Sequence, residues 1–283
     1  MLHIATVHYE SPRWIEIQAR HLREHISVPY QTWSSLQHID PSYSVHFDRV
    51  IQQLGPHAGK LNHLALEISH EASDSDLLMF LDGDAFPIVD PMPLITDGLS
   101  RAPLIAVRRA ENVNEPQPHP CFCVTTVGTW RGLPGDWSLG ATWPEVGGAP
   151  VSDVGANLLR ALQLTETPWV ELLRTNGTKL HPLFFAVYAD TVYHHGAGFR
   201  QDMITRRDRE MEVERFMTAR IPVLRPVMSR INRRRLESAR RTNSHRTRHQ
   251  SQLIVERLQQ GGDSSWLAEL SDGAMSEKEA VHR

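Results

Sequence analysis

Cysteine is nearly absent from this chain, which has only Cys121 and Cys123 among 283 residues. The two lie one residue apart in an apolar run, so in a strand they would point to opposite faces and could not readily bridge each other. A chain of this length can bury a substantial core without covalent cross-links. We therefore expect both cysteines to be reduced packing residues rather than a redox or metal pair.

Long hydrophobic runs are also missing. Residues 1–7 do not combine a basic segment with a long apolar stretch, which is the pattern of a secretory leader. Nor does any later segment approach the roughly 20 apolar residues that cross a bilayer. These absences lead us to expect a cytoplasmic protein.

A strong overall charge is the third absence, since the formal net charge is only -3. The distribution is uneven, because residues 200–250 hold 15 arginines against 6 acidic residues. Such a segment is suited to an anionic membrane surface, a charged acceptor or RNA. It is equally compatible with a solvated helical face, and we expect at most peripheral contact with the inner face of a membrane.

Apolar patterning predicts alternating strands and helices over the first two thirds of the chain. Short apolar runs predict strands at residues 3–8, 30–33, 77–81, 121–127, 169–173 and 186–194, with a further apolar stretch at 103–107. Helical spacing predicts helices at residues 14–25 and 63–68, and another that begins at Asp153. Residues 128–150 are rich in Gly and Trp and are expected to form a loop.

The run at residues 77–81 lacks the alternation of a half-exposed strand, which indicates a central strand covered on both faces. We therefore expect an α/β fold in which residues 1–200 form a Rossmann-like mixed sheet flanked by helices. Residues 1–110 are expected to be its nucleotide-binding half and residues 111–200 its second half. Residues 201–283 are expected to be a helical, Arg-rich extension, partly disordered at its end.

Two aspartates follow this strand directly, in the triplet Asp82-Gly83-Asp84. In an open α/β sheet their carboxylates would lie at the carboxyl edge, where such folds bind ligands. Mg²⁺ and Mn²⁺ prefer hard oxygen ligands of this kind, completed by phosphate and water. Gly83 would let a diphosphate approach the backbone. A solvated turn at the end of the strand is the alternative.

In this context the sequence resembles the GT-A glycosyltransferases, which have an Asp-x-Asp motif after a buried strand. The resemblance extends over roughly residues 1–200 and is carried by residues 76–87, Asp-Leu-Leu-Met-Phe-Leu-Asp-Gly-Asp-Ala-Phe-Pro. It implies a nucleoside-diphosphate-sugar donor and a Mn²⁺ or Mg²⁺ ion that joins Asp82 and Asp84 to the donor diphosphate. It also makes residues 111–200 the acceptor half.

In many such enzymes a histidine from near the end of the catalytic domain joins the metal. Here residues 192–200 read Val-Tyr-His-His-Gly-Ala-Gly-Phe-Arg. Similarity to a His-x-x-Gly pattern favours His195 as the ligand, and His194 is the second candidate. A histidine pair bonded only to backbone groups is the alternative. Arg200 is expected to neutralise diphosphate charge as the leaving group departs.

A second carboxylate opens the predicted helix at Asp153. In the GT-A pattern an acidic residue at this place faces the acceptor, so Asp153 would be the general base if transfer inverts the anomeric centre. If transfer retains the configuration, Asp153 or Asn157 would instead position the donor sugar. Glu145 is a weaker candidate for the base, and an ordinary helix cap is the alternative for Asp153.

Nucleotide bases in this architecture lie over the end of the first strand. His8, Tyr9 and Glu10 hold that position, and the Tyr9 ring is suited to stack on a base. Lys60 and Asn62 come at the start of a helix and are candidates for phosphate or ribose contacts.

Three tryptophans lie in the predicted loop at positions 130, 137 and 143. An exposed Trp can stack on a sugar ring, yet we expect core packing for at least two of them.

Metal-dependent glycosyl transfer to a hydroxyl of a saccharide, lipid-linked glycan or protein accounts for most of these features. A haloacid-dehalogenase-type phosphatase also has Asp-x-Asp after an apolar strand, but there the motif normally lies near the N-terminus. A sugar-nucleotide nucleotidyltransferase would need a Gly-rich basic loop after the first strand, which is missing. RNA or membrane binding through residues 200–250 would leave the aspartate pair unexplained, and we do not expect nucleic acid to be the partner.

Overall fold

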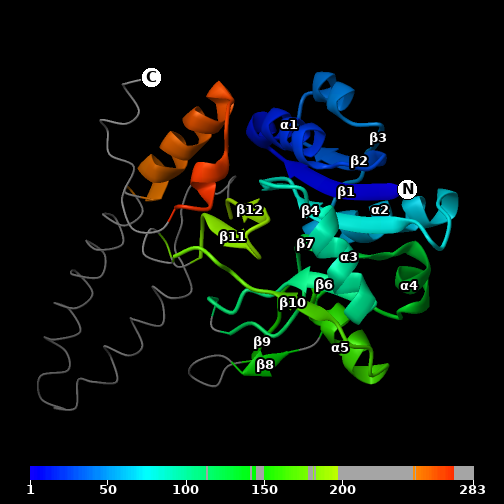
Figure 1. The fold of residues 1–283 in the computed structure, drawn as a ribbon. Helices are drawn as coiled ribbons and strands as arrows, with labels where there is room; N and C mark the ends of the chain where they lie inside the picture. The colour runs from blue at the N-terminus through cyan, green and yellow to red at the C-terminus, as the bar shows by residue number, and fades with distance from the viewer. Residues whose placement is uncertain are drawn as a thin grey trace, which may run out of the picture.

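The computed structural model describes residues 1–112, 114–140, 142–144, 150–177, 181, 183–196, 245 and 247–270. Within these residues the chain forms an α/β fold with a seven-stranded sheet in the order β10-β6-β7-β4-β1-β2-β3 (Figure 1). Its strands are β1 Leu2–Tyr9, β2 Tyr30–Gln37, β3 Arg49–Ile51, β4 Leu77–Asp82, β6 Leu104–Val107, β7 His119–Thr126 and β10 Val170–Leu172. Only β7 runs antiparallel to its neighbours, so the sheet is mixed, as the sequence predicted.

Helices cover both faces of this sheet. They are α1 Ile15–His25, α2 His57–Glu71, α3 Met92–Arg101, α4 Val127–Gly132 and α5 Ala156–Leu164, with 3-10 turns at Pro12–Trp14 and Pro41–His46. Side chains of α2, α4 and α5 join one core cluster, and side chains of α1 and α3 join the cluster on the opposite face. Cys123 belongs to the first cluster and Cys121 to the second, which confirms that they point to opposite faces and pack in the core as free thiols.

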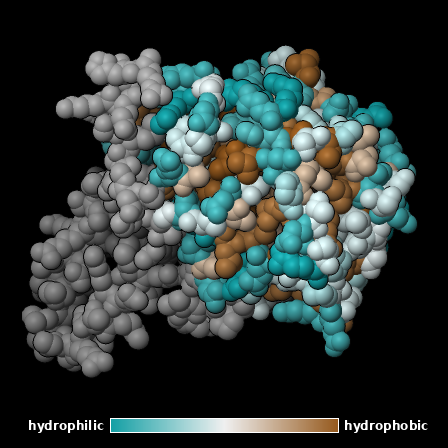
Figure 2. Space-filling view, in the orientation of Figure 1, coloured by the Kyte–Doolittle hydropathy of each residue, from teal (hydrophilic) through white to brown (hydrophobic). Residues whose placement is uncertain are grey.

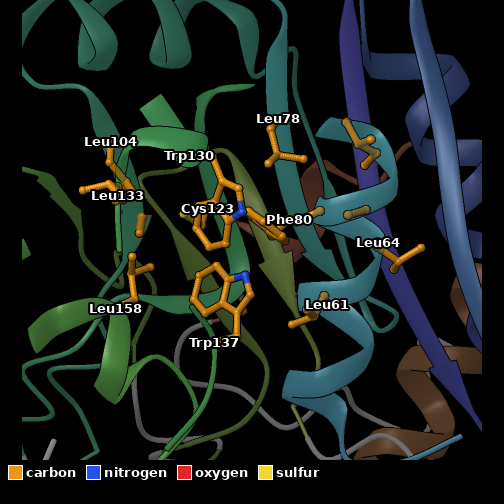
Figure 3. Close-up of a cluster of buried hydrophobic side chains, with 14 of the residues drawn as sticks. Leu61, Leu64, Leu78, Phe80, Leu104, Cys123, Trp130, Leu133, Trp137 and Leu158 are labelled. Carbon is orange, nitrogen blue, oxygen red and sulfur yellow. The ribbon is translucent and has the colours of Figure 1, made fainter. Parts of the chain in front are cut away.

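The first cluster is built around aromatic rings (Figure 3). The ring of Phe80, on β4, lies 4.7 Å from the Trp130 ring and 5.0 Å from the Trp137 ring. Both tryptophans are buried, which confirms core packing rather than sugar stacking for these two. The side chain of Trp143 lies outside the described residues.

The region from residue 128 to 150 was predicted to be a loop, and this is wrong for its first residues. Thr126 accepts a hydrogen bond from the Thr129 N–H at 3.1 Å, and this cap starts the short helix α4. A two-stranded ribbon follows, formed by β8 Trp143–Pro144 and β9 Pro150–Val151. The next helix, α5, begins at Ala156 rather than at Asp153, because Gly155 at its N-cap has a φ of +90°.

A three-stranded sheet in the order β11-β12-β5 lies beside the main sheet. Its strands are β5 Ala85–Pro87, β11 Ala186–Tyr188 and β12 Val192–His194. The single strand predicted over residues 186–194 is therefore a hairpin. Ala189 and Asp190 have φ values of +49° and +52°, the left-handed pair that a tight hairpin turn requires.

The C-terminal segment packs against this smaller sheet. Residues 247–260 are helical, and a 3-10 turn follows at Ser265–Leu267. Ile254, Leu258 and Leu267 are buried in a third cluster with residues of α1 and β5. The predicted Arg-rich helix over residues 201–244, and the C-terminal end predicted to be disordered, lie outside the described residues.

The surface is chemically mixed. Figure 2 shows hydrophobic residues gathered in the middle of one face and hydrophilic residues around them. Among the described residues no helix combines the length and apolar character that a membrane span requires.

Candidate metal and donor site

The candidate site forms where β1 and β4 end side by side. These strands are parallel and paired in register, so that Val7 lies opposite Asp82. His8 and Tyr9 therefore reach the same edge of the sheet as the triplet Asp82-Gly83-Asp84. The sequence predicted this placement, and it brings the proposed base-binding and diphosphate-binding residues together.

Asp82 and Asp84 are joined by His194. Ligand atoms of these three residues all lie within 4.8 Å of one another. The His194 Nε2 atom is 3.4 Å from Asp84 Oδ1 and 3.7 Å from Asp82 Oδ2. Pairing of β12 with β5 produces this approach, because it sets His194 opposite Ala85, the residue after Asp84. Two carboxylates and one imidazole are donors that a divalent cation accepts.

The structure brings His194 to the aspartates and not His195, which was the first choice from the sequence. Neighbouring residues of an extended strand point to opposite faces, so only one of the two can face the pair. The His195 ring is buried against Trp14, 4.4 Å between centroids. Its nitrogens form hydrogen bonds with the Tyr193 hydroxyl at 2.9 Å and the Ser251 hydroxyl at 2.7 Å. Burial lowers the pKa of His195 to about 3, so the ring is neutral.

Two further histidines surround Asp82, and neither was identified from the sequence. His57 Nε2, at the start of α2, lies 3.0 Å from Asp82 Oδ1. His119 Nδ1, at the start of β7, lies 4.0 Å from Asp82 Oδ2 and also accepts a hydrogen bond from the Cys121 N–H at 3.1 Å. The antiparallel pairing of β7 with β4 brings His119 to this edge. The local sequence around His119 does not predict that pairing.

Electrostatics at this cluster favour a positive charge between the carboxylates. Burial alone would lower the pKa of His194, but the adjacent Cys121 and Asp84 raise it well above the ordinary value. His119 shows the opposite result, because its burial and the nearby Arg109 lower its pKa well below the ordinary value. His119 is therefore a neutral ring beside the aspartates.

Gly83 is required by packing at the base of the site. A Cβ atom at this position would lie 2.5 Å from the Val7 carbonyl oxygen and 2.7 Å from His8 Nδ1. His8 itself is buried, its Nε2 lies 3.2 Å from the Gln18 side-chain oxygen, and burial lowers its pKa to about 4. His8 thus packs closely against Gly83, and its predicted contact with the donor remains a prediction.

Tyr9 and Lys60 form a second group beside the strand end. The Lys60 ammonium lies 5.0 Å from the centre of the Tyr9 ring, a cation–π distance. Lys60 is largely buried, and this burial lowers its pKa. Asn62 accepts a hydrogen bond from the Trp137 N–H at 2.9 Å and so ties α2 to the segment before β8. Its predicted ribose or phosphate contact remains a prediction.

Asp153 is held by a part-buried arginine. The Arg109 guanidinium donates to Glu115 at 2.9 Å and to Asp153 at 3.3 Å. Burial alone would lower the pKa of Arg109, but the two carboxylates raise it above its ordinary value. Asp153 keeps 43% of its side chain exposed and does not cap α5, since Gly155 does. Arg200 and Glu145 lie outside the described residues.

Comparisons with known proteins find similar solved structures but no similar sequence. No family model matches the sequence, and no characterised protein matches it by sequence either. The structural neighbours are GT-A glycosyltransferases. One is the mannosyltransferase PcManGT from Pyrobaculum calidifontis, solved with GDP-Man and Mn²⁺, at a TM-score of 0.40 and 13% identity over 93% of this chain and 76% of that one.

Two other neighbours are similar over a smaller part. The galactosyltransferase LgtC has a TM-score of 0.33 and 12% identity, over 46% of this chain and 59% of its own. Residues 1–349 of S. aureus TarS have a TM-score of 0.34 and 10% identity, over 46% of this chain and 48% of that fragment. This chain thus spans about half the length of each of these two solved chains.

Proposed function

We propose that this protein is a metal-dependent glycosyltransferase, which moves a sugar from a nucleoside-diphosphate sugar to a hydroxyl group. The observation that carries the proposal is the convergence of Asp82, Asp84 and His194 within 4.8 Å. This trio lies at the carboxyl ends of two parallel strands, the edge at which open α/β sheets bind nucleotides. The acceptor hydroxyl would belong to a saccharide, a lipid-linked glycan or a protein.

The donor atoms suit Mn²⁺ or Mg²⁺. Asp82 and Asp84 supply hard carboxylate oxygens, and His194 supplies one imidazole nitrogen, a set that manganese accepts readily. The three side chains are between 6% and 15% exposed, so they are sheltered yet reachable from the strand edge. A bound cation would supply positive charge that stabilises a departing nucleoside diphosphate.

The neighbouring side chains suggest how the donor is held. Tyr9, at the end of β1, is placed to stack on the nucleotide base, with the Lys60 ammonium beside it to meet the ribose or a phosphate. Both groups lie at the strand edge that carries Asp82. These contacts with the donor are part of the proposal, as is charge neutralisation by Arg200.

Asp153 is the proposed general base if transfer inverts the anomeric centre. Its exposed carboxylate can meet an acceptor hydroxyl, while the ion pair with Arg109 fixes its position. Arg109 also acts on the pKa of His119, which itself lies 4.0 Å from Asp82. The charge of Arg109 therefore acts on both Asp153 and the histidine beside Asp82.

A donor screen by thermal shift tests the function. The unmodified protein is heated with a panel of nucleoside diphosphates and their sugar esters, GDP-mannose and UDP-sugars included, with and without Mn²⁺. We expect stabilisation by one nucleotide family that requires the metal. At a ligand concentration 100 times the Kd this amounts to about 2.7 kcal/mol.

The Asp84→Asn variant should lose this metal-dependent stabilisation. Asp97→Asn is the matched control, because Asp97 is an exposed aspartate on α3 that pairs with Arg101 at 2.8 Å. Stabilisation that persists in Asp84→Asn would refute the site. Release of inorganic phosphate from sugar phosphates, without any nucleotide binding, would favour the phosphatase alternative.

A further inference from the structure

A second cluster of metal-ligating side chains lies on helix α1, outside the site described above. His21, Glu24 and His25 each offer one ligand atom, and these atoms all lie within 4.8 Å of one another. Residues three and four apart share one face of a helix, so the spacing itself sets the three side chains together. The same His-x-x-Glu-His spacing occurs in zinc-binding helices.

His21 is arranged as a metal ligand is. It is only 1% exposed, and its ring lies 4.1 Å from the Phe86 ring. One ring nitrogen forms a hydrogen bond with the backbone of Pro87, which has no N–H and can only accept. The other nitrogen, Nδ1, is buried and has no hydrogen-bond partner. The Pro87 carbonyl thus accepts a hydrogen bond from the Nε2–H group and leaves the Nδ1 lone pair uncommitted. Metal-bound histidines are oriented in the same way.

His25 completes the pair. Its ring centre lies 5.5 Å from that of His21, and its Nε2 atom is also buried without a hydrogen-bond partner. An unsatisfied buried nitrogen is costly, and two in adjacent rings are unusual in a packed protein. A ligand that accepts lone pairs from both rings would remove this cost.

We propose that His21, Glu24 and His25 form a binding site for a borderline-soft divalent metal ion of the Zn²⁺ type. Two imidazoles and one carboxylate are a set that zinc prefers and Mg²⁺ does not. The site is nitrogen-rich, whereas the aspartate site is oxygen-rich, and the two should select different ions.

Neighbouring charges are compatible with a cation at this place. The Arg20 guanidinium lies in the same turn, but its NH2 group donates to the Leu258 carbonyl and its Nε atom is 4.0 Å from Glu24 Oε1. The carboxylate of Asp263, in the C-terminal segment, interacts electrostatically with Arg257 and more weakly with His25. Glu24 thus offsets part of the Arg20 charge, and Asp263 adds a negative charge close to His25.

The metal would have a structural effect. Through its bond to the Pro87 carbonyl, His21 connects α1 to β5, which begins directly after Asp84. A metal on α1 would fix the His21 ring and so stabilise its packing against the Phe86 ring of β5. This proposal does not depend on glycosyl transfer.

Zinc binding to the metal-free full-length protein tests the site. The protein is stripped with a chelator and titrated with Zn²⁺ by calorimetry, for the unmodified chain, His25→Ala and Glu24→Gln. His63→Ala is the control, because His63 is partly exposed and also has a glutamate four residues on, at 4.0 Å. Asp84→Asn is titrated in parallel to remove binding at the aspartate site.

We expect a Zn²⁺ site that persists in Asp84→Asn and His63→Ala. Loss of a ligand in His25→Ala should weaken it by about 10-fold to 100-fold or more, with a smaller effect in Glu24→Gln. His25 is only partly buried, so the variant should fold, and circular dichroism of the metal-free form checks this. Zinc affinity in His25→Ala equal to that of the unmodified protein would overturn the proposal, and so would loss of all zinc binding in Asp84→Asn.

Discussion

His57 should control the affinity of the aspartate site for its metal without being a ligand itself. Its Nε2 atom lies 3.0 Å from Asp82 Oδ1, while the other oxygen, Oδ2, faces His194 at 3.7 Å. His57 thus holds one oxygen of the carboxylate and turns the second toward the metal position. The substitution His57→Ala removes this hydrogen bond and lets the carboxylate rotate.

The expected loss of metal affinity in His57→Ala can be estimated from similar supporting contacts in metalloproteins. Loss of a group that orients a ligand typically weakens metal binding about 10-fold to 100-fold, which corresponds to about 1.4 to 2.7 kcal/mol. Because the His57 side chain is 38% exposed, its truncation should leave a small cavity and little loss of stability. The effect on metal binding should therefore exceed the effect on folding.

Calorimetric titration with Mn²⁺ measures the change in the unmodified protein and His57→Ala. His63→Ala is closely matched, because it lies on the same helix with 36% of its side chain exposed. His57→Gln, which can still donate a hydrogen bond to Asp82, should recover part of the affinity. Equal Mn²⁺ affinity in the unmodified protein and His57→Ala would show that Asp82 needs no such support.

Two further predictions concern stability. Arg109→Met should destabilise the fold by about 3 to 5 kcal/mol, because it breaks the ion pair of Arg109 with the Glu115 carboxylate, which is 2% exposed. Urea unfolding measures this, and adding Glu115→Gln should restore most of the loss; a cost below about 1 kcal/mol for the single variant would contradict the argument. Stability should also fall on acidification from pH 6.5 toward 4, because the folded-state pKa values of His8 and His21 are lowered to about 4 and about 3 and the unfolded chain takes up protons first. Each histidine contributes about 1.4 kcal/mol per pH unit; urea midpoints that do not change between pH 6.5 and 4 would show that these rings are not buried and neutral.

Several elements could be predicted because their cause is local. The unbroken apolar run before Asp82 indicated a central covered strand, and β4 has that position in the sheet. Periodic apolar residues indicated helix α1, which ends at His25 as expected. The two strand ends that carry Tyr9 and Asp82 could be placed together, because parallel neighbouring strands end at the same edge of a sheet.

Other features depend on contacts between distant segments. The hairpin that divides residues 186–194 depends on two left-handed residues with ordinary side chains, Ala189 and Asp190, which carry no glycine signal. Which of the two adjacent histidines faces Asp84 depends on the register of β12 against β5. A shift of this register by one residue would turn the other histidine toward Asp84. A motif resembling His-x-x-Gly favoured His195, whereas the structure sets His194 beside the aspartates.

The sequence by itself determined the α/β pattern, the aspartate pair and its place after a buried strand, because apolar periodicity and strand length are encoded by neighbouring residues. Tertiary structure alone decided that His57, His119 and His194 gather around Asp82. They come from a helix start, an antiparallel strand and a hairpin far apart in the chain. Strand pairing and helix packing set these distances, and both are properties of the folded whole rather than of any local segment.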